Sequence, residues 1–308
     1  MRAFIFPGQG SQAVGMGAAL AGASRPAHDV FAEVDEALGQ NLFRLMREGP
    51  DEELKLTENA QPAIMANAVA VFRTFGVDLA SVADSVAGHS LGEYSALCAA
   101  GSFDLATTAK LLKLRGQAMQ QAVPVGVGAM AALLGADLAL AQRIADAAAQ
   151  GEVCTVANDN DPAQVVISGH KGAIDRAIEL AKEMGAKRAL PLPVSAPFHC
   201  PLMQPAAEAM RDALGYVVVE APVVPLYANV TAEPETDPDT IRNQLVEQMT
   251  GMVRWRESVA NMAAGGVDEF VELGGKVLGG MVKRIVPDAK VTSVVTIEDV
   301  EALAKEIA

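Results

Sequence analysis

Cysteine and histidine are both scarce in this sequence of 308 residues. The three cysteines, Cys98, Cys154 and Cys200, lie far apart, so they suggest neither a disulfide framework nor a Cys-x-x-Cys metal pair. The four histidines are too scattered to indicate a zinc site. We therefore expect a protein of the reducing cytoplasm that holds no metal.

Basic residues are also in deficit, with 24 Lys and Arg against 38 Asp and Glu and a net charge of −14. This balance argues against DNA or RNA as the main partner, because binding to phosphates needs a basic surface. Hydrophobic residues make up 51% of the chain and charged residues only 20%, which excludes intrinsic disorder. The length suffices for one large domain or two smaller ones.

The sequence lacks a hydrophobic run suited to a membrane. The longest uncharged stretch, residues 116–136, is long enough to span a bilayer, but it contains glutamines, a proline and four glycines. We interpret it as the end of a helix, a loop and a strand. At the N-terminus, residues 2–6 are apolar and stop at Pro7, which predicts a buried strand rather than a signal peptide.

Strands and helices alternate along the chain, which predicts an α/β fold with a mainly parallel sheet. Asp104 is the expected N-cap of one of the helices. The predicted strands are 2–6, 82–87, 223–228 and 269–272, and the predicted helices are 27–38, 60–76, a run ending at 100, 105–122 and one from about 240.

The middle of the chain has a different pattern. Its predicted elements are strand 129–134, helix 137–150, strand 153–157, a turn at 158–162 (NDNDP), strand 164–168, helix 173–184 and strand 188–192. This β-α-β-β-α-β order is ferredoxin-like. We therefore expect a large hydrolase-like α/β subdomain, residues 1–126 and 195–308, with a small ferredoxin-like subdomain, residues 127–194, inserted in it.

The segment Gly88-His89-Ser90-Leu91-Gly92 matches G-x-S-x-G and lies between a predicted strand and a predicted helix. This context is typical of a nucleophile elbow, in which flanking glycines permit a sharp turn that exposes the serine. The amide of Leu91 would then lie at a helix N-terminus, directed at a developing oxyanion. A strand-to-helix turn with a capping serine is the simpler alternative.

A nucleophilic serine needs a base, and His199 is the best candidate. It lies in a proline-bounded loop, residues 194–201, where the chain returns from the predicted small subdomain. His89 adjoins the serine, but neighbouring side chains diverge in a tight elbow, so we expect it to support the turn.

Three segments together resemble a known family: residues 6–12 (FPGQGSQ), residues 88–93 (GHSLGE) and the Pro-Phe-His sequence at 197–199. They are similar to the malonyl-CoA:acyl carrier protein transacylases and to the acyltransferase domains of fatty acid and polyketide synthases. The resemblance runs from residue 4 to about residue 285. It implies that a malonyl group passes from malonyl-CoA to Ser90 and then to the phosphopantetheine thiol of acyl carrier protein, with His199 as general base.

The resemblance also implies roles for residues elsewhere in the chain. The oxyanion hole would be formed by the amides of Gln9 and Leu91, and Gly8 and Gly10 would leave the Gln9 amide unshielded. Arg115 would bind the malonyl carboxylate, for which a planar guanidinium is suited.

Three more residues match positions of the family. Gln248 would orient the base by offering an oxygen to the imidazole, and Asn229 would lie near the substrate pocket. Phe198 would narrow the pocket beside the acyl α-carbon and disfavour a methyl branch, by about 1–3 kcal/mol.

The expected partners are malonyl-CoA and an acidic acyl carrier protein, with no nucleic acid, membrane or enzyme-bound cofactor. We expect a free-standing, cytoplasmic, monomeric enzyme. Because the chain itself is acidic, docking must depend on local basic groups. The candidates are Lys187, Arg188, Arg254, Arg256, Lys276, Lys283 and Arg284.

Two other functions remain open at this stage. A serine hydrolase or thioesterase would share Ser90, His199 and the oxyanion hole, but it would activate water after acylation. A carboxylate-binding Arg115 favours the transferase, because a general esterase has little use for one. A non-catalytic carrier-protein binding module is disfavoured, because its elbow serine would usually be lost.

Overall fold

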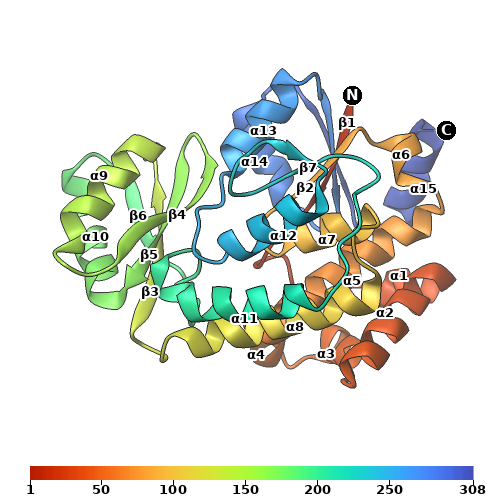
Figure 1. Cartoon of the computed structure of the whole chain (residues 1–308). Helices are drawn as coiled ribbons and strands as arrows, with labels where there is room; N and C mark the ends of the chain where they lie inside the picture. The colour runs from red at the N-terminus through yellow and green to blue at the C-terminus, as the bar shows by residue number, and fades with distance from the viewer. Residues whose placement is uncertain (308) are drawn as a thin grey trace.

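The computed structural model describes residues 1–307 and contains two β-sheets (Figure 1). The larger sheet has six strands in the order β10-β9-β1-β2-β7-β8, and all its pairings are parallel except the one between β7 and β8. The prediction of an α/β fold with a mainly parallel sheet is therefore confirmed. The strands are β1 (Arg2–Phe6), β2 (Ser85–Gly88), β7 (Leu226–Tyr227), β8 (Pro234–Glu235), β9 (Glu269–Leu273) and β10 (Lys290–Val294).

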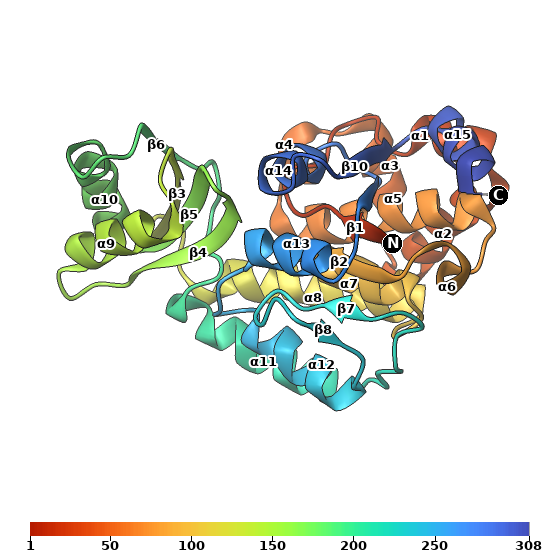
Figure 2. The same cartoon turned by 90° about the horizontal axis from the view of Figure 1, so that it is seen from above.

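Helices cover both faces of the larger sheet (Figures 1 and 2). They are α1 (Ala18–Ala23), α2 (Arg25–Leu38), α3 (Leu42–Glu48), α4 (Asp51–Leu54), α5 (Thr57–Phe75), α6 (Leu79–Val82), α7 (Gly92–Ala99), α8 (Leu105–Ala122), α11 (Gln204–Gly215), α12 (Pro238–Glu247), α13 (Trp255–Ala264), α14 (Leu278–Ile285) and α15 (Ile297–Ile307). As predicted, the side chain of Asp104 caps α8 by accepting a hydrogen bond from the Thr107 amide.

Strand β1 explains why the N-terminal segment is apolar throughout. Phe4 and Phe6 point into the larger core with α2, α5, α7 and α8, whereas Ala3 and Ile5 point into the core beneath α13 and α14. All four side chains are fully buried. A parallel strand covered on both faces needs such a continuous hydrophobic run.

The smaller sheet is antiparallel, has the strand order β4-β5-β3-β6, and is covered by α9 (Leu138–Ala149) and α10 (Lys171–Glu183) (Figure 2). Its strands are β3 (Gly128–Leu134), β4 (Cys154–Asp161), β5 (Gln164–His170) and β6 (Arg188–Pro191). Side chains of β3 alternate: Ala131 and Leu133 pack beneath the two helices, whereas Met130 and Ala132 join the core of the larger unit.

The predicted turn at 158–162 is wrong for most of its length. Strand β4 continues to Asp161 through two register shifts, and the turn is confined to residues 162–163. The polar residues remain in a strand because the larger unit satisfies them: Asp159 binds Arg256 and Asp161 binds Arg284. Main-chain bonds between Val253 and residues 157 and 159 add a short ladder between the two units.

Strand 223–228 was also predicted too long, since β7 contains only Leu226 and Tyr227. Pro225 precedes it and has no N–H group, so it can only accept a hydrogen bond, from the Val86 amide.

The ion pair between Arg284 and Asp161 gives a test of how the two units are joined. Arg284→Met should lower the free energy of unfolding by about 1–3 kcal/mol, because it leaves a buried carboxylate without its cation while Arg284 itself is partly exposed. Urea denaturation would measure the change. Arg25→Met is the matched control, since its pair with Asp29 is exposed and should contribute less than about 0.5 kcal/mol. Equal effects of the two substitutions would contradict a structural role for Asp161.

Candidate active site

Ser90 lies in a sharp turn between β2 and α7, with a left-handed backbone at φ 54°. The turn depends on glycine at both sides. A Cβ atom on Gly88 would lie 1.9 Å from the carbonyl of Gly92, and one on Gly92 would lie 2.2 Å from the Phe6 oxygen. The geometry is that of a nucleophile elbow, which holds a strained serine at the carboxyl end of the sheet.

His199 lies beside the serine, as the sequence predicted. Its Nε2 atom is 2.7 Å from Ser90 Oγ, and its Nδ1 atom is 2.8 Å from the main-chain oxygen of Gln248. Because a carbonyl can only accept, Nδ1 carries the proton and Nε2 is left to accept the proton of the serine. His89 instead places Nε2 2.8 Å from Asn160 Oδ1, which supports the elbow from the small sheet.

Electrostatics keep His199 neutral. Burial lowers its pKa to about 3, and the positive charge of Arg115 contributes in the same direction. The imidazole therefore stays unprotonated throughout the physiological range, ready to act as a base.

Two main-chain amides next to the serine are available to an oxyanion. Within residues 1–307, neither the Gln9 nor the Leu91 amide donates to a protein acceptor. The loop that carries Gln9 packs directly on the elbow, since a Cβ atom on Gly8 would lie 2.6 Å from the His89 oxygen. Gln9 and Leu91 thus both line the cavity beyond the carboxyl ends of β1 and β2.

Arg115 is buried in α8, with 1% of its surface exposed. Its Nη2 atom donates to Ser90 Oγ over 3.1 Å and to Gln248 Oε1 over 2.8 Å, and its Nη1 atom donates to Gln61 Oε1 over 2.8 Å. The guanidinium also lies 5.7 Å from the ring centroid of Tyr94. No carboxylate within residues 1–307 forms an ion pair with it, so a buried positive charge without a counter-ion lies beside the nucleophile.

Gln248 contacts both His199 and Arg115, through its main chain and its side chain respectively. The oxygen that it offers to His199 belongs to the main chain, whereas its side-chain oxygen binds Arg115. Its side-chain nitrogen donates to Ser90 O over 3.0 Å. The side chain therefore organises the arginine and the serine, and the backbone orients the base.

Asn229 was expected near the substrate pocket, and it lies behind the elbow rather than on the wall of the cavity. It is fully buried and is not among the residues that line the cavity. Its Oδ1 atom accepts from the Ser90 amide over 2.8 Å, and its Nδ2 atom donates to Gly88 O over 2.7 Å. Asn229 holds the elbow in its strained conformation.

A cavity of about 450 Å³ opens onto Ser90 between the two sheets. Phe198 lines it beside His199 and is almost fully buried. The other lining residues include Gln9, Gln61, Leu91, Arg115, Met119, Met130, Leu192 and Val194. The sequence had given no role to Gln61 or Tyr94, and no local pattern distinguishes either from other buried helical residues.

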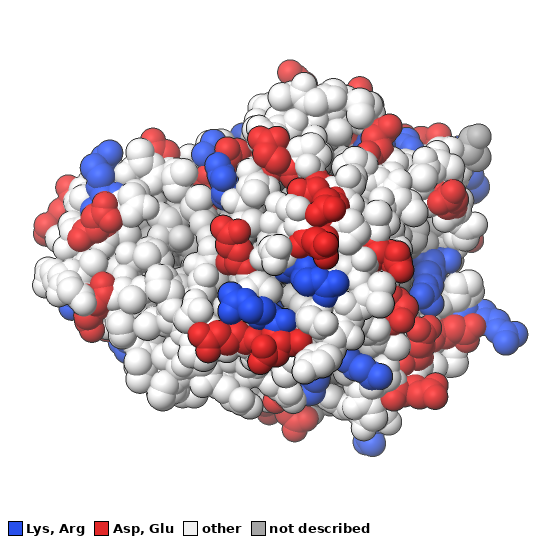
Figure 3. Space-filling model, in the orientation of Figure 1, with Lys and Arg blue, Asp and Glu red and all other residues white. Residues whose placement is uncertain are grey.

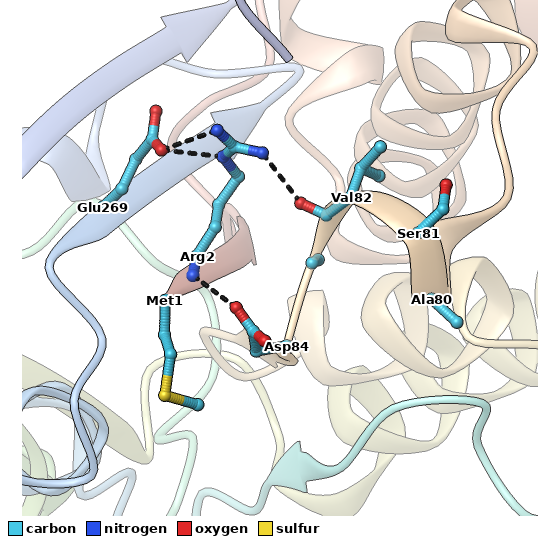
Figure 4. A pocket seen from close by; sticks show the side chains of 8 residues that line it. Met1, Arg2, Ala80, Ser81, Val82, Asp84 and Glu269 are labelled. Carbon is cyan, nitrogen blue, oxygen red and sulfur yellow. Dashed lines mark hydrogen bonds and ion pairs between the residues drawn. The ribbon is translucent and has the colours of Figure 1, made fainter. Parts of the chain in front are cut away.

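A smaller pocket of about 260 Å³ lies at the opposite ends of the strands (Figure 4). Its charged groups bind one another: Arg2 Nε donates to Glu269 over 2.8 Å, and the Arg2 amide donates to Asp84 over 2.7 Å. We assign this pocket a structural role. Among residues 1–307, no three His, Cys, Asp or Glu side chains are grouped so as to hold a metal ion, and no helix is long and apolar enough to cross a membrane.

Comparison with known proteins gives one consistent result. A family model described as the acyl transferase domain matches residues 3–278. A malonyl CoA-acyl carrier protein transacylase from Escherichia coli strain K12 is 48% identical over 285 residues, 92% of each chain. The structure of an acyl-carrier-protein-S-malonyltransferase from Bartonella henselae is 51% identical with a TM-score of 0.97, and 99% of each chain is covered. A malonyl-transacylase solved in complex with a type II PKS acyl-carrier protein is 41% identical with a TM-score of 0.96, again over 99% of each chain.

The low pKa of His199 predicts how the reactivity of Ser90 depends on pH. The rate of inactivation by phenylmethylsulfonyl fluoride should change less than about twofold between pH 5 and 8, because His199 is already neutral at pH 5. His199→Ala should lose most of this reactivity at every pH in the range. An inflection near pH 6.5 that persists in Glu93→Gln would show that His199 titrates normally and would contradict the buried, neutral base; the variant is needed because the pKa of the neighbouring Glu93 is about 7.

Proposed function

Because the chain belongs to the acyl transferase family, we propose that it transfers the malonyl group of malonyl-CoA to the phosphopantetheine thiol of acyl carrier protein in fatty acid synthesis. The observation that carries the proposal is the buried charge of Arg115, which lies 3.1 Å from Ser90 Oγ and forms no direct ion pair with a carboxylate of residues 1–307. Such a cation favours an acyl group that brings its own carboxylate.

In the first half-reaction, Ser90 Oγ attacks the thioester carbonyl carbon while His199 Nε2 takes the hydroxyl proton. The amides of Gln9 and Leu91 donate to the oxyanion of the tetrahedral intermediate. The intermediate collapses with loss of the coenzyme A thiolate, which receives the proton from His199. The product is a malonyl ester on Ser90.

The second half-reaction repeats these steps with another thiol. His199 removes the proton from the phosphopantetheine thiol, whose sulfur attacks the malonyl ester. Ser90 then leaves with the proton, and the malonyl thioester of the carrier is released. Because the residues described above can perform each step, we propose that no enzyme-bound cofactor takes part.

Phe198 and the cavity around it also support a preference for unbranched acyl groups. The ring is almost fully buried and borders the space next to His199, so it has little freedom to move aside for a methyl branch. We propose that it narrows the site at the acyl α-carbon.

For the acidic carrier protein, we propose docking through Lys187, Arg188 and Lys276. The other four candidates already have partners: Arg254 pairs with Glu257, Arg256 with Asp159 and Arg284 with Asp161, and Lys283 donates to the main-chain oxygen of Ala289. Arg188 begins β6, which leads into the cavity wall at residues 192–194. Lys276 lines a neighbouring cavity of about 490 Å³ that shares Gly10 and Gln12 with the active-site cavity.

The surface charge fits such local docking. On the face shown in Figure 3, basic side chains are interspersed among acidic ones. We further propose a cytoplasmic location, which is supported by the three cysteines, all of them free thiols. We also propose that the enzyme is a monomer.

Mass spectrometry would distinguish the transferase from the hydrolase alternative. Mixed briefly with malonyl-CoA and no carrier protein, the enzyme should retain a malonyl adduct on Ser90, and added carrier protein should discharge it. Ser90→Ala should form no adduct and transfer no malonyl. Release of free malonate without a detectable adduct would support hydrolysis instead.

Arg115 should determine the choice of acyl group. Arg115→Ala should reduce kcat/KM for malonyl-CoA by roughly 30- to 5,000-fold, because it removes one partner of a buried charge pair worth roughly 2–5 kcal/mol. Acetyl transfer should be spared or improved. Arg115→Lys should recover little, since lysine lacks the planar fork. An equal loss for malonyl-CoA and acetyl-CoA would make Arg115 a structural residue.

A further inference from the structure

Glu93, in the first turn of α7, has no part in the steps above, although it is buried directly behind the catalytic residues. Its side chain is 1% exposed. Glu93 Oε2 accepts from Gln248 Nε2 over 2.5 Å and from the Asn229 amide over 3.4 Å. These two partners are the residues whose side chains hold the main chain of Ser90.

The contacts of Gln248 show what the carboxylate does. Three oxygens surround its side-chain nitrogen, namely Glu93 Oε2, Ser90 O and Asn229 Oδ1, and its side-chain oxygen faces Arg115 Nη2. A flipped amide would direct its oxygen at these acceptors and its NH₂ group at a guanidinium, which can only donate. Glu93 Oε2 makes the shortest of the three contacts, 2.5 Å against 3.0 Å for Ser90 O and 3.3 Å for Asn229 Oδ1, so it contributes most to this orientation.

The same arrangement keeps the carboxylate away from Arg115. Glu93 forms no ion pair within residues 1–307, because the neutral amide of Gln248 lies between it and the guanidinium. Burial raises the pKa of Glu93 to about 7, whereas the hydrogen bonds from Gln248 and Asn229 and the charge of Arg115 oppose the rise. Above neutral pH the group is therefore mainly a carboxylate.

We propose that Glu93 is a positioning residue for substrate selection: it fixes the Gln248 amide so that Arg115 stays directed at Ser90, and it leaves the arginine unpaired for the carboxylate of the substrate. The inference rests on the proposed function, because it assumes that malonyl binds Arg115. The Gln248 amide allows Arg115 to be held in place and yet remain charged. A carboxylate paired directly with Arg115 would hold the side chain but would also neutralise it.

The test compares variants of Glu93 by the ratio of kcat/KM for malonyl-CoA to kcat/KM for acetyl-CoA at pH 8. Glu93→Met removes the acceptor at similar volume and should lower the ratio by roughly 10- to 100-fold. Glu93→Gln removes the charge but keeps an acceptor, and it should restore most of the ratio. If charge alone mattered, the two variants would behave alike, and the proposal would be overturned.

A double variant provides a test that does not depend on how well Glu93→Met folds. Combining Glu93→Gln with Gln248→Glu exchanges the two groups at nearly constant volume and places a carboxylate against Arg115. Both transfer rates should fall, because a carboxylate at position 248 cannot donate to Ser90 O, but the ratio of kcat/KM for malonyl-CoA to kcat/KM for acetyl-CoA should fall as well, since Arg115 is then neutralised. A preserved preference would refute the need for a neutral group between the carboxylate and Arg115.

Glu272 is the matched control, since it is a fully buried carboxylate that accepts from the amides of Val277, Leu278 and Gly279 and has no hydrogen bond to the Ser90 cluster. Glu272→Met should lower malonyl and acetyl transfer together, after normalisation to the Ser90 that can be acylated. The same pattern in Glu93→Met would make Glu93 merely structural. If the unmodified enzyme transferred no malonyl, the proposed function itself would fail, which is a different result from an unchanged ratio in the variants.

Discussion

The buried guanidinium of Arg115 is the constraint on which the active site depends. A charge without a counter-ion is expensive to bury, so its N–H groups must find neutral oxygens. Gln61 from α5, Gln248 after α12 and Ser90 from the elbow supply them, and Tyr94 of α7 lies near the cation. Four separate segments are thereby brought to one point. The arrangement stabilises the arginine without pairing it directly, which leaves the guanidinium free for the substrate carboxylate that we propose it binds.

The same charge influences the base. Arg115 and burial together disfavour imidazolium, so His199 is neutral before the reaction. Its proton acceptor is a main-chain carbonyl rather than a carboxylate, which fixes the tautomer but stabilises the imidazolium less. A neutral carbonyl beside His199 suits a site that accepts a negatively charged acyl group, because a carboxylate at that position would repel the substrate.

The small sheet is coupled to the elbow through strand β4. Asp159 and Asp161 bind arginines of α13 and α14, and between them Asn160 reaches the ring of His89, which adjoins Ser90. The position of the small sheet therefore bears directly on His89, the residue next to the nucleophile.

Local sequence determined much of this protein. Burial and backbone preference depend on residues that are close in the chain, so they can be predicted from it. They specify strand β1 from the apolar run at 2–6, the start of α8 from the capping Asp104, and most of the elements between residues 129 and 192. The glycines around Ser90 specify the elbow for the same reason, because no other residue fits that turn. The proline-bounded loop pointed to His199 as the base, and the comparison with known motifs added Gln9 and Arg115, residues that local pattern alone would have left among structural or solvated ones.

Only the tertiary structure decided how the polar residues are used. The segment 158–162 has the composition of a turn, but arginines far along the chain satisfy its carboxylates and keep it in a strand. Asn229 proved to hold the elbow, and the side chain of Gln248 proved to bind Arg115, although both carry ordinary amides in the sequence. A hydrophobic residue needs only to be buried, and periodicity reveals that. A buried polar group needs a particular partner, and this partner is set by the fold rather than by neighbours in the chain.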